Sequence, residues 1–229
     1  MRTLVKSMMA SAFIPLAVVV ASGSAKAVLC GGPTTNTLAD FVTATGVSNG
    51  VSCTVGDKTF SNFSYNPDGL NVPAANVGVS PDTLLGLPGL VFNGGWSNTT
   101  TANEDALITF TVAAPAASPI TDFHLALDGV VGSVLDAATL SLPGGGFVAS
   151  LSSSDDNLHT VSFAAVQTLV VADDLTIDGV VGTTVSSASS VHKGFSQVPG
   201  PIVGAGLPGL VAACAGLIGL ARRRRRQIA

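Results

Sequence analysis

Residues 106–129 read ALITFTVAAPAASPITDFHLALDG, and this stretch is the strongest indication of the fold. Its first part, 106–112, is rich in β-forming residues. In its second part Phe123, Leu125 and Leu127 alternate with other residues, so an extended chain places them on one face. The Asp128-Gly129 pair that follows is typical of a tight turn. The stretch therefore predicts two β-strands joined by a proline-containing loop.

The same pattern of short apolar or alternating runs continues on both sides. Further candidate strands lie at residues 58–65, 146–151, 158–164, 168–171, 175–178 and 183–191. Short strands separated by turn residues, with about 8–12 residues from one to the next, are typical of sandwiches and barrels. Only residues 36–44 and 81–85 hint at helix. We predict an all-β fold, with one antiparallel, jelly-roll-like β-sandwich over residues 28–197.

The charges are unevenly placed along the 229 residues. Only 10% of the residues are charged and 47% are hydrophobic, which disfavours intrinsic disorder. All 14 acidic residues lie between Asp40 and Asp178, and the only basic residues from Val28 to Val198 are Lys58 and Lys193. This part of the chain therefore has a net charge of −12. It would repel phosphate backbones, so no nucleic-acid partner is expected.

Residues 1–27 have the three parts of a secretory signal peptide. Arg2 and Lys6 precede an apolar run from Met8 to Val20, and Ala25 and Ala27 place small side chains at positions −3 and −1 of a cleavage after Ala27. A retained membrane helix is the weaker alternative, because crossing a bilayer core of about 30 Å takes about 20 residues. We predict that the chain is exported across the inner membrane.

Residues 202–221 are uncharged and apolar, and a basic end, 222–229, follows. A helix of this length would cover about 30 Å, the thickness of a bilayer core. The basic cluster consists of Arg222, Arg223, Arg224, Arg225 and Arg226. The positive-inside rule leaves these arginines in the cytoplasm and the body outside. We predict one C-terminal transmembrane helix, which would serve either as a permanent anchor or as part of a processed tail.

A short motif, Val198-Pro199-Gly200-Pro201, stands directly before this apolar run. Proline fixes φ and lacks an N–H, so the motif is expected to stay extended and accessible to a protease. A proline-containing tripeptide, one apolar span and a terminal arginine cluster together resemble the PEP-CTERM sorting tail of exported bacterial proteins. Residues 203–209, VGAGLPG, are similar to a variant of these tails.

The resemblance covers residues 198–229 and implies a partner and a fate. The implied partner is an exosortase-like membrane protease-transpeptidase, which would cut near the tripeptide and release the protein or transfer it to the cell surface. Pro199 and Pro201 match the family's two prolines. Gly200 departs from the usual Glu, which leaves the exosortase subtype open.

Two of the three cysteines lie in the exported part. Cys30 and Cys53 are 23 residues apart, and in an oxidising compartment a disulfide between them is the expectation. A metal pair is the alternative, but no histidine lies near them in the sequence. A lipoprotein signal at Cys30 is weaker still, because Leu29 is bulky where a small residue is expected. Cys214, within the apolar tail, is expected to act as a small apolar residue.

No motif for catalysis is present. Residues 142–146, LPGGG, lack the Lys-Ser/Thr of a phosphate loop and are typical of a turn, and no G-x-S-x-G occurs. A Ser–His–Asp triad gathered by the fold stays open as a minor alternative. His124 is expected to face solvent from a strand, and His159 to close a turn. We predict no catalytic residue, no cofactor and no metal ligand.

Three acidic doublets could supply oxygen ligands to Ca²⁺, although none has the spacing of a known calcium loop. They are Glu104-Asp105, Asp155-Asp156 and Asp173-Asp174. Solvated carboxylates in loops are the simpler interpretation. The sequence therefore favours a non-enzymatic surface or matrix structural protein, sorted through its tail, with extracellular polysaccharide as a further partner. The alternative is a membrane-anchored or secreted module that binds glycan or Ca²⁺.

Overall fold

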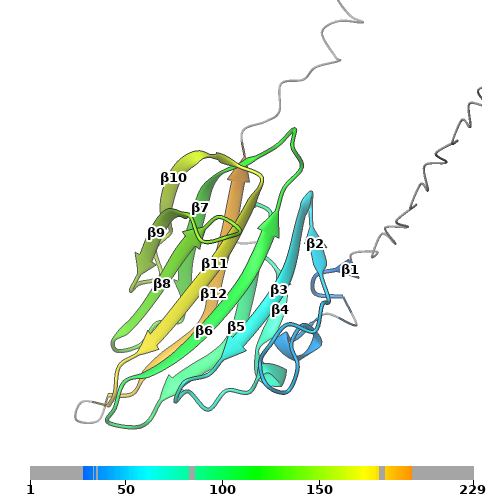
Figure 1. The fold of residues 1–229 in the computed structure, drawn as a ribbon. Helices are drawn as coiled ribbons and strands as arrows, with labels where there is room; N and C mark the ends of the chain where they lie inside the picture. The colour runs from blue at the N-terminus through cyan, green and yellow to red at the C-terminus, as the bar shows by residue number, and fades with distance from the viewer. Residues whose placement is uncertain (1–27, 33, 35, 83–85, 181–183, 198–229) are drawn as a thin grey trace, which may run out of the picture.

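Two β-sheets pack face to face in the computed structural model, which describes residues 28–32, 34, 36–82, 86–180 and 184–197 (Figure 1). In this part of the chain the seven-stranded sheet has the order β1-β2-β3-β6-β11-β8-β9, and the five-stranded sheet the order β10-β7-β12-β5-β4. The strands are β1 (Val28–Leu29), β2 (Cys53–Val55), β3 (Lys58–Asn66), β4 (Gly78–Pro81), β5 (Gly89–Asn98), β6 (Glu104–Ala113), β7 (Ile120–Asp128), β8 (Val134–Ser141), β9 (Phe147–Ser153), β10 (His159–Val166), β11 (Thr168–Ile177) and β12 (Ser186–Gln197). The prediction of an all-β, two-sheet fold is confirmed.

The core lies between the sheets and is centred on Phe110 of β6. Its ring centroid lies 5.8 Å from those of Phe63 and Phe92, 6.1 Å from Phe60 and 6.3 Å from Phe195. All five rings are buried, and they come from both sheets. Buried aromatic side chains remove large apolar areas from water, and their pairwise contacts contribute about 0.5–1.5 kcal/mol each beyond that burial. This cluster holds the two sheets together.

The alternation read from the sequence matches the two faces of the strands. Phe123, Leu125 and Leu127 of β7 point into the core as predicted, each paired with a core-facing residue of β12. The predicted runs 168–171 and 175–178 form one continuous strand, β11, because Ala172, Asp173 and Asp174 continue the ladder. The sequence pattern missed β5 and β8, whose apolar residues are interrupted by glycine, asparagine or aspartate.

The two helical predictions are wrong where the structure tests them. Residues 36–44 hold only a 3₁₀ turn, η1 (Leu38–Asp40), and a second turn, η2 (Ala74–Asn76), lies in a segment not predicted as helix. The carboxylate of Asp40 accepts the backbone N–H groups of Asn36 and Thr37, each at 2.9 Å, which caps the start of η1. Pro81 belongs to β4, and residues 83–85 lie outside the described part.

A disulfide joins Cys30 to Cys53, as the sequence predicts. It fixes the parallel pair β1–β2 at the edge of the seven-stranded sheet. Among the described residues the helical segments are the short 3₁₀ turns η1 and η2, and neither could span a bilayer. The signal residues Ala25 and Ala27, the motif Val198–Pro201, the apolar run 202–221 and the arginines 222–226 all lie outside those residues.

Candidate functional site

The outer face of the five-stranded sheet carries two hydrogen-bonded groups of polar side chains, each built around a histidine. The pairing register places His124 opposite Gly194 of β12 and Thr160 of β10. It places His192 opposite Ala126 of β7 and Val91 of β5. These residues alternate with the core-facing positions, so both histidines point away from the core. Strand alternation predicted this orientation for His124, whereas no motif in the sequence singled out His192.

The first group on this face is the His124 patch, defined as Asp122, His124, Thr160, Ser162 and Ser196. His124 Nδ1 lies 2.8 Å from the Thr160 hydroxyl, and its Nε2 lies 3.2 Å from the Ser196 hydroxyl. Ser196 in turn donates to Asp122 Oδ2 at 2.7 Å. Thr160 and Ser162 are exposed and the other three are half-buried. Strands β7, β10 and β12 therefore position one connected, accessible array.

The protonation states determine which group of the patch donates and which accepts in each hydrogen bond. Hydrogen bonds from Ser162 and Ser196 lower the pKa of Asp122, so its carboxylate is ionised and only accepts. Burial lowers the pKa of His124 despite the nearby charge of Asp122, so the ring is neutral at pH 7. Because Ser196 donates to Asp122, it accepts from His124 Nε2, and Nδ1 accepts from Thr160. Thr160 and Asp122 keep acceptor lone pairs for a ligand.

The second group is the His192 cluster, defined as Asp82, Asp128, Ser190 and His192. His192 Nδ1 lies 3.2 Å from Asp82 Oδ1, and its Nε2 lies 2.9 Å from Asp128 Oδ2. Ser190 Oγ lies 3.3 Å from the same Nε2. His192 is buried, with 6% of its surface exposed. The cluster ties β12 to the end of β4 and to β7.

A Ser–His–Asp nucleophile is the obvious chemistry to test against the His192 cluster. Burial by itself would lower the pKa of His192, but the carboxylates of Asp82 and Asp128 outweigh it and the pKa is raised. A ring held between two carboxylates donates a hydrogen from each nitrogen and has no lone pair left for a serine proton. The cluster therefore fits a structural clamp better than a general base.

The acidic doublets do not converge on a cation. Asp155 lies in the turn before β10, where His159 and Asn157 hydrogen-bond to it and lower its pKa to about 2. His159 closes this turn, as predicted. Asp173 corrects the interpretation of the doublets as solvated loop carboxylates, because it lies in the middle of β11 and is fully buried. Within the described ranges, no three His, Cys, Asp or Glu side chains are placed to hold a metal ion.

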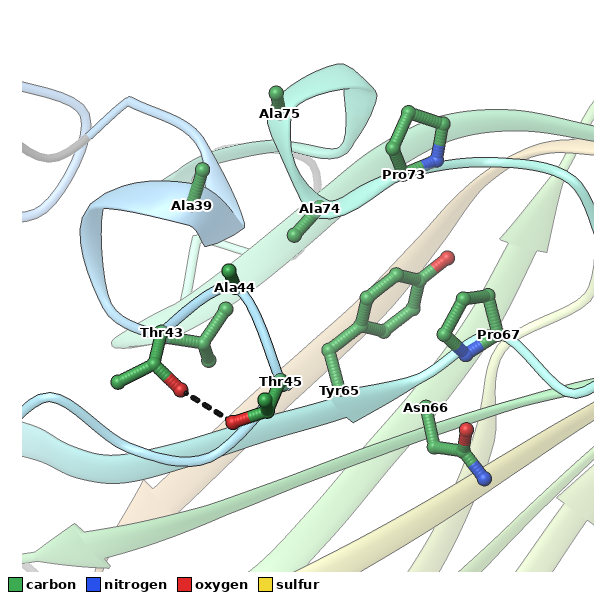
Figure 2. A pocket seen from close by; sticks show the side chains of 12 residues that line it. Ala39, Thr43, Ala44, Thr45, Tyr65, Asn66, Pro67, Pro73, Ala74 and Ala75 are labelled. Carbon is green, nitrogen blue, oxygen red and sulfur yellow. Dashed lines mark hydrogen bonds between the residues drawn. The ribbon is translucent and has the colours of Figure 1, made fainter.

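A hollow of about 530 Å³ lies beside Tyr65, between the segment that follows η1 and the start of η2 (Figure 2). Alanine, proline and threonine side chains line most of it. Its polar groups are largely satisfied within the protein: Thr43 pairs with Thr45 at 2.9 Å, and the Tyr65 hydroxyl donates to Val72 O at 2.7 Å. Its lining contains no Asp, Glu, Lys, Arg or His. A ligand could fit this hollow by shape, but the lining offers few polar groups with which to bind it.

Many sugar-binding sites would need an exposed aromatic side chain on which a sugar ring can stack. Trp96 and Tyr65, the only tryptophan and tyrosine of the chain, are both buried. Phe147 of β9 is the aromatic residue among the exposed large hydrophobic side chains of the described part, at 70% exposure. It lies on the other sheet from the His124 patch. Recognition at that patch must therefore rest on hydrogen bonds.

No protein-family model matches the sequence, and no curated protein matches it significantly. Among solved structures, the carbohydrate-binding module TmCBM61 in complex with β-1,4-galactotriose aligns with 58% of this chain and 88% of its own, at 10% identity and a TM-score of 0.33. TmCBM27, described as recognising mannan, aligns with 64% of this chain and 93% of its own, at 11% identity and a TM-score of 0.24. The enzymatically active domain of tailspike protein 4 of bacteriophage CBA120 aligns with 60% of this chain but only 20% of its own, at 17% identity and a TM-score of 0.31. TM-scores this low support no conclusion about this chain.

Proposed function

We propose that this protein is an exported, non-enzymatic surface module that binds neutral polysaccharide through the His124 patch. The observation that carries the proposal is the connected array Thr160–His124–Ser196–Asp122 on the outer face of the five-stranded sheet. Its side chains hold one another in place, so little rotamer entropy remains to be lost on binding. Such an array of hydroxyl, imidazole and carboxylate groups is suited to a ligand rich in hydroxyls.

The charge of the body narrows the class of ligand. Residues 28–198 carry a net charge of −12, and Asp122 adds an ionised carboxylate within the patch itself. Anionic polysaccharides such as alginate would be repelled at low salt. A neutral chain avoids this repulsion, and its vicinal hydroxyls can donate to Asp122 and Thr160.

Affinity gel electrophoresis of the full chain in dextran, galactan, mannan or alginate tests this proposal. We expect at least one neutral polysaccharide to retard the protein, and alginate to have no such effect. Thr160→Ala removes one hydrogen bond of about 1 kcal/mol, which corresponds to about fivefold weaker binding. Asp122→Asn also weakens binding, because the array loses its charged acceptor.

Thr139→Ala is the matched control. Thr139 is also an exposed strand threonine, but it lies on β8 of the other sheet. The Thr139→Ala variant should bind the polysaccharide as tightly as the wild type does. Retardation that is the same for the wild type, Thr160→Ala and Asp122→Asn, or absent in every neutral polysaccharide, would show that the patch is not a glycan site.

The two ends of the chain are proposed to direct the export and the sorting of the sandwich. In this proposal, residues 1–27 are a cleaved signal peptide, one jelly-roll-like sandwich spans 28–197, and 198–229 are a PEP-CTERM-like sorting tail with a transmembrane helix over 202–221. The order of motif, apolar run and arginines in the sequence supports this. The disulfide Cys30–Cys53 supports export, because such bonds persist in oxidising compartments. An exosortase-like enzyme would act at Val198–Pro201 and leave the sandwich at the cell surface.

Mass spectrometry of the C-terminal peptide of the mature protein, recovered from its own cells, tests the sorting step. We expect a terminus at or near residues 198–201, without the apolar run and the arginines. An intact terminus at Ala229 in the membrane fraction would instead identify a permanent single-pass anchor. Glycan binding by the sandwich and processing of the tail are measured separately, so one can fail without the other.

A further inference from the structure

One lysine and two aspartates meet in the core between the two sheets. Lys193 comes from β12 of the five-stranded sheet, whereas Asp136 and Asp173 come from β8 and β11 of the seven-stranded sheet. Lys193 Nζ lies 2.5 Å from Asp136 Oδ2 and is also in ion-pair contact with Asp173 Oδ1. All three side chains have zero exposure to solvent.

The surroundings of this triad are apolar. On the core face of β12, Val191 and Phe195 flank Lys193, while Val171 and Leu175 flank Asp173 on β11. In the cross-strand register, Lys193 lies opposite Leu90 and Leu125. Three ionised groups here would leave a net charge of −1 without water, which is strongly unfavourable.

Burial and the proximity of the two carboxyl groups indicate which of them carries the neutralising proton. In the described part of the chain, Asp136 Oδ1 and Asp173 Oδ2 receive no hydrogen bond from a nitrogen donor, and the Lys193 ammonium is the cation beside Asp173 Oδ1. Burial, then the nearby charge of Asp173, raises the pKa of Asp136 well above its usual range despite the opposing Lys193. This shift favours the protonated, neutral form of Asp136, and one protonated carboxyl leaves the buried triad without net charge.

We propose that Lys193 and Asp136 condense to an intramolecular amide that covalently links the two sheets. In this step Asp173 takes a proton from the Lys193 ammonium, and the free Nζ attacks Cγ of the protonated Asp136 carboxyl. The new Nζ–Cγ bond forms as the C–OH bond of Asp136 breaks. The departing hydroxyl takes up a second proton from the nitrogen, passed on by Asp173, and leaves as water. The products are one amide, one water and a neutral Asp173, so atoms and charge balance without a co-reactant.

Geometry and environment both favour this step. The nucleophile, the electrophile and the base are held together at contact distance by strands of two sheets, which gives a high effective concentration. The apolar surroundings favour the neutral acid form of Asp136, which is the form that the amine attacks. They also exclude the bulk water that would hydrolyse the amide. The product would anchor the last described strand, β12, to β8 in addition to backbone hydrogen bonding.

Peptide mass spectrometry of the exported full chain, after reduction and denaturation, tests the proposal. Chymotrypsin should join the peptide 136–140 to the peptide that ends at Phe195, at a mass lower than their sum by one water molecule. The second buried lysine, Lys58, is an internal control. It contacts Asp57, whose side chain is one-third exposed, and the half-buried Gln197, so neither neighbour is a fully buried acid and Lys58 should be recovered unlinked.

Variants separate the reacting carboxyl from the base. Asp173→Asn should fold without forming the amide, because the proton acceptor is lost. Asp136→Asn should form the same amide with ammonia as the leaving group, so its linked peptide has the same mass as that of the wild type. Should Asp173→Asn fail to fold, Asp136→Asn and the wild type decide the matter. Peptide 136–140 recovered only unlinked from both would overturn the proposal, and a link to Asp173 would overturn its assignment to Asp136.

Discussion

His192 Nε2 lies 2.9 Å from Oδ2 of Asp128, so a side-chain contact joins β12 to β7 in addition to their ladder of backbone hydrogen bonds. The two residues are 64 positions apart in the sequence. The same ring reaches Asp82 at the end of β4 with its other nitrogen. One imidazole therefore braces three segments on the outer face of the five-stranded sheet.

The two histidines of this face should titrate on opposite sides of the usual value of about 6.5. Two carboxylates raise the pKa of His192 against the effect of burial, whereas burial lowers the pKa of His124. NMR titration of the ring protons should resolve the two. Asp128→Asn should lower the pKa of His192 and leave that of His124 nearly unchanged. The reverse order of the two pKa values would contradict the assigned hydrogen bonds.

The His192 cluster should make part of the stability depend on pH. Because the folded-state pKa of His192 lies above its unfolded value, folding is favoured by proton binding. This contribution is complete below about pH 6.5 and is lost as the pH rises through the folded-state pKa. Thermal unfolding should show Asp128→Asn less stable than wild type at pH 6, with a smaller difference at pH 9. A gap that widens with pH would refute this account.

The disulfide should contribute on the order of 3 kcal/mol to the free energy of unfolding, because it closes a loop between residues 23 apart. Chemical unfolding of the Cys30→Ser/Cys53→Ser variant measures this. Reduction of the wild type should cause a comparable loss, whereas the variant should not respond to a reducing agent. A variant as stable as the oxidised wild type would mean that the β1–β2 edge adds little to the fold.

Gly94 of β5 should not tolerate a methyl group. A Cβ at this position would lie 2.2 Å from Cε2 of Trp96, whose ring is fully buried. Overpacking of this kind costs about 1–3 kcal/mol, so Gly94→Ala should lower the free energy of unfolding by that amount. Gly146→Ala is the control, because its nearest contact would be an ordinary 3.5 Å to Leu142. Equal stability of the two variants would contradict the packing described here.

Individual strands show which parts of the fold could be predicted from the local sequence pattern and which could not. Strand β7 was predictable because Phe123, Leu125 and Leu127 alternate with outward-facing residues. Strand β5 was not, because Gly94 interrupts its apolar run, and the reason for that glycine is the Trp96 ring that packs over it. The residues 172–174 seemed to break β11 in two, since two adjacent aspartates normally indicate a loop.

For the candidate sites, the sequence could indicate which residue types are present but not which of them lie close together in the folded protein. Orientation of His124 toward the outer face follows from strand periodicity alone. Its bonds to Thr160 and Ser196 span 36 and 72 positions, and only the order of strands β10-β7-β12 brings these residues together. No sequence signal marked His192, whose partner Asp82 is 110 positions away.

Properties that depend on near neighbours along the chain could be derived from the sequence. These are the all-β class, from alternation and turn residues, and the pairing of Cys30 with Cys53, from their number and setting. Properties that depend on strand order became visible in the folded protein. Asp173 is a loop-like carboxylate in the sequence, but pairing of β11 with β6 and β8 places it in the core against Lys193 of the opposite sheet. A buried charge requires a partner of opposite charge, and the packing of the two sheets determines which residue, distant in the sequence, lies close enough to supply it.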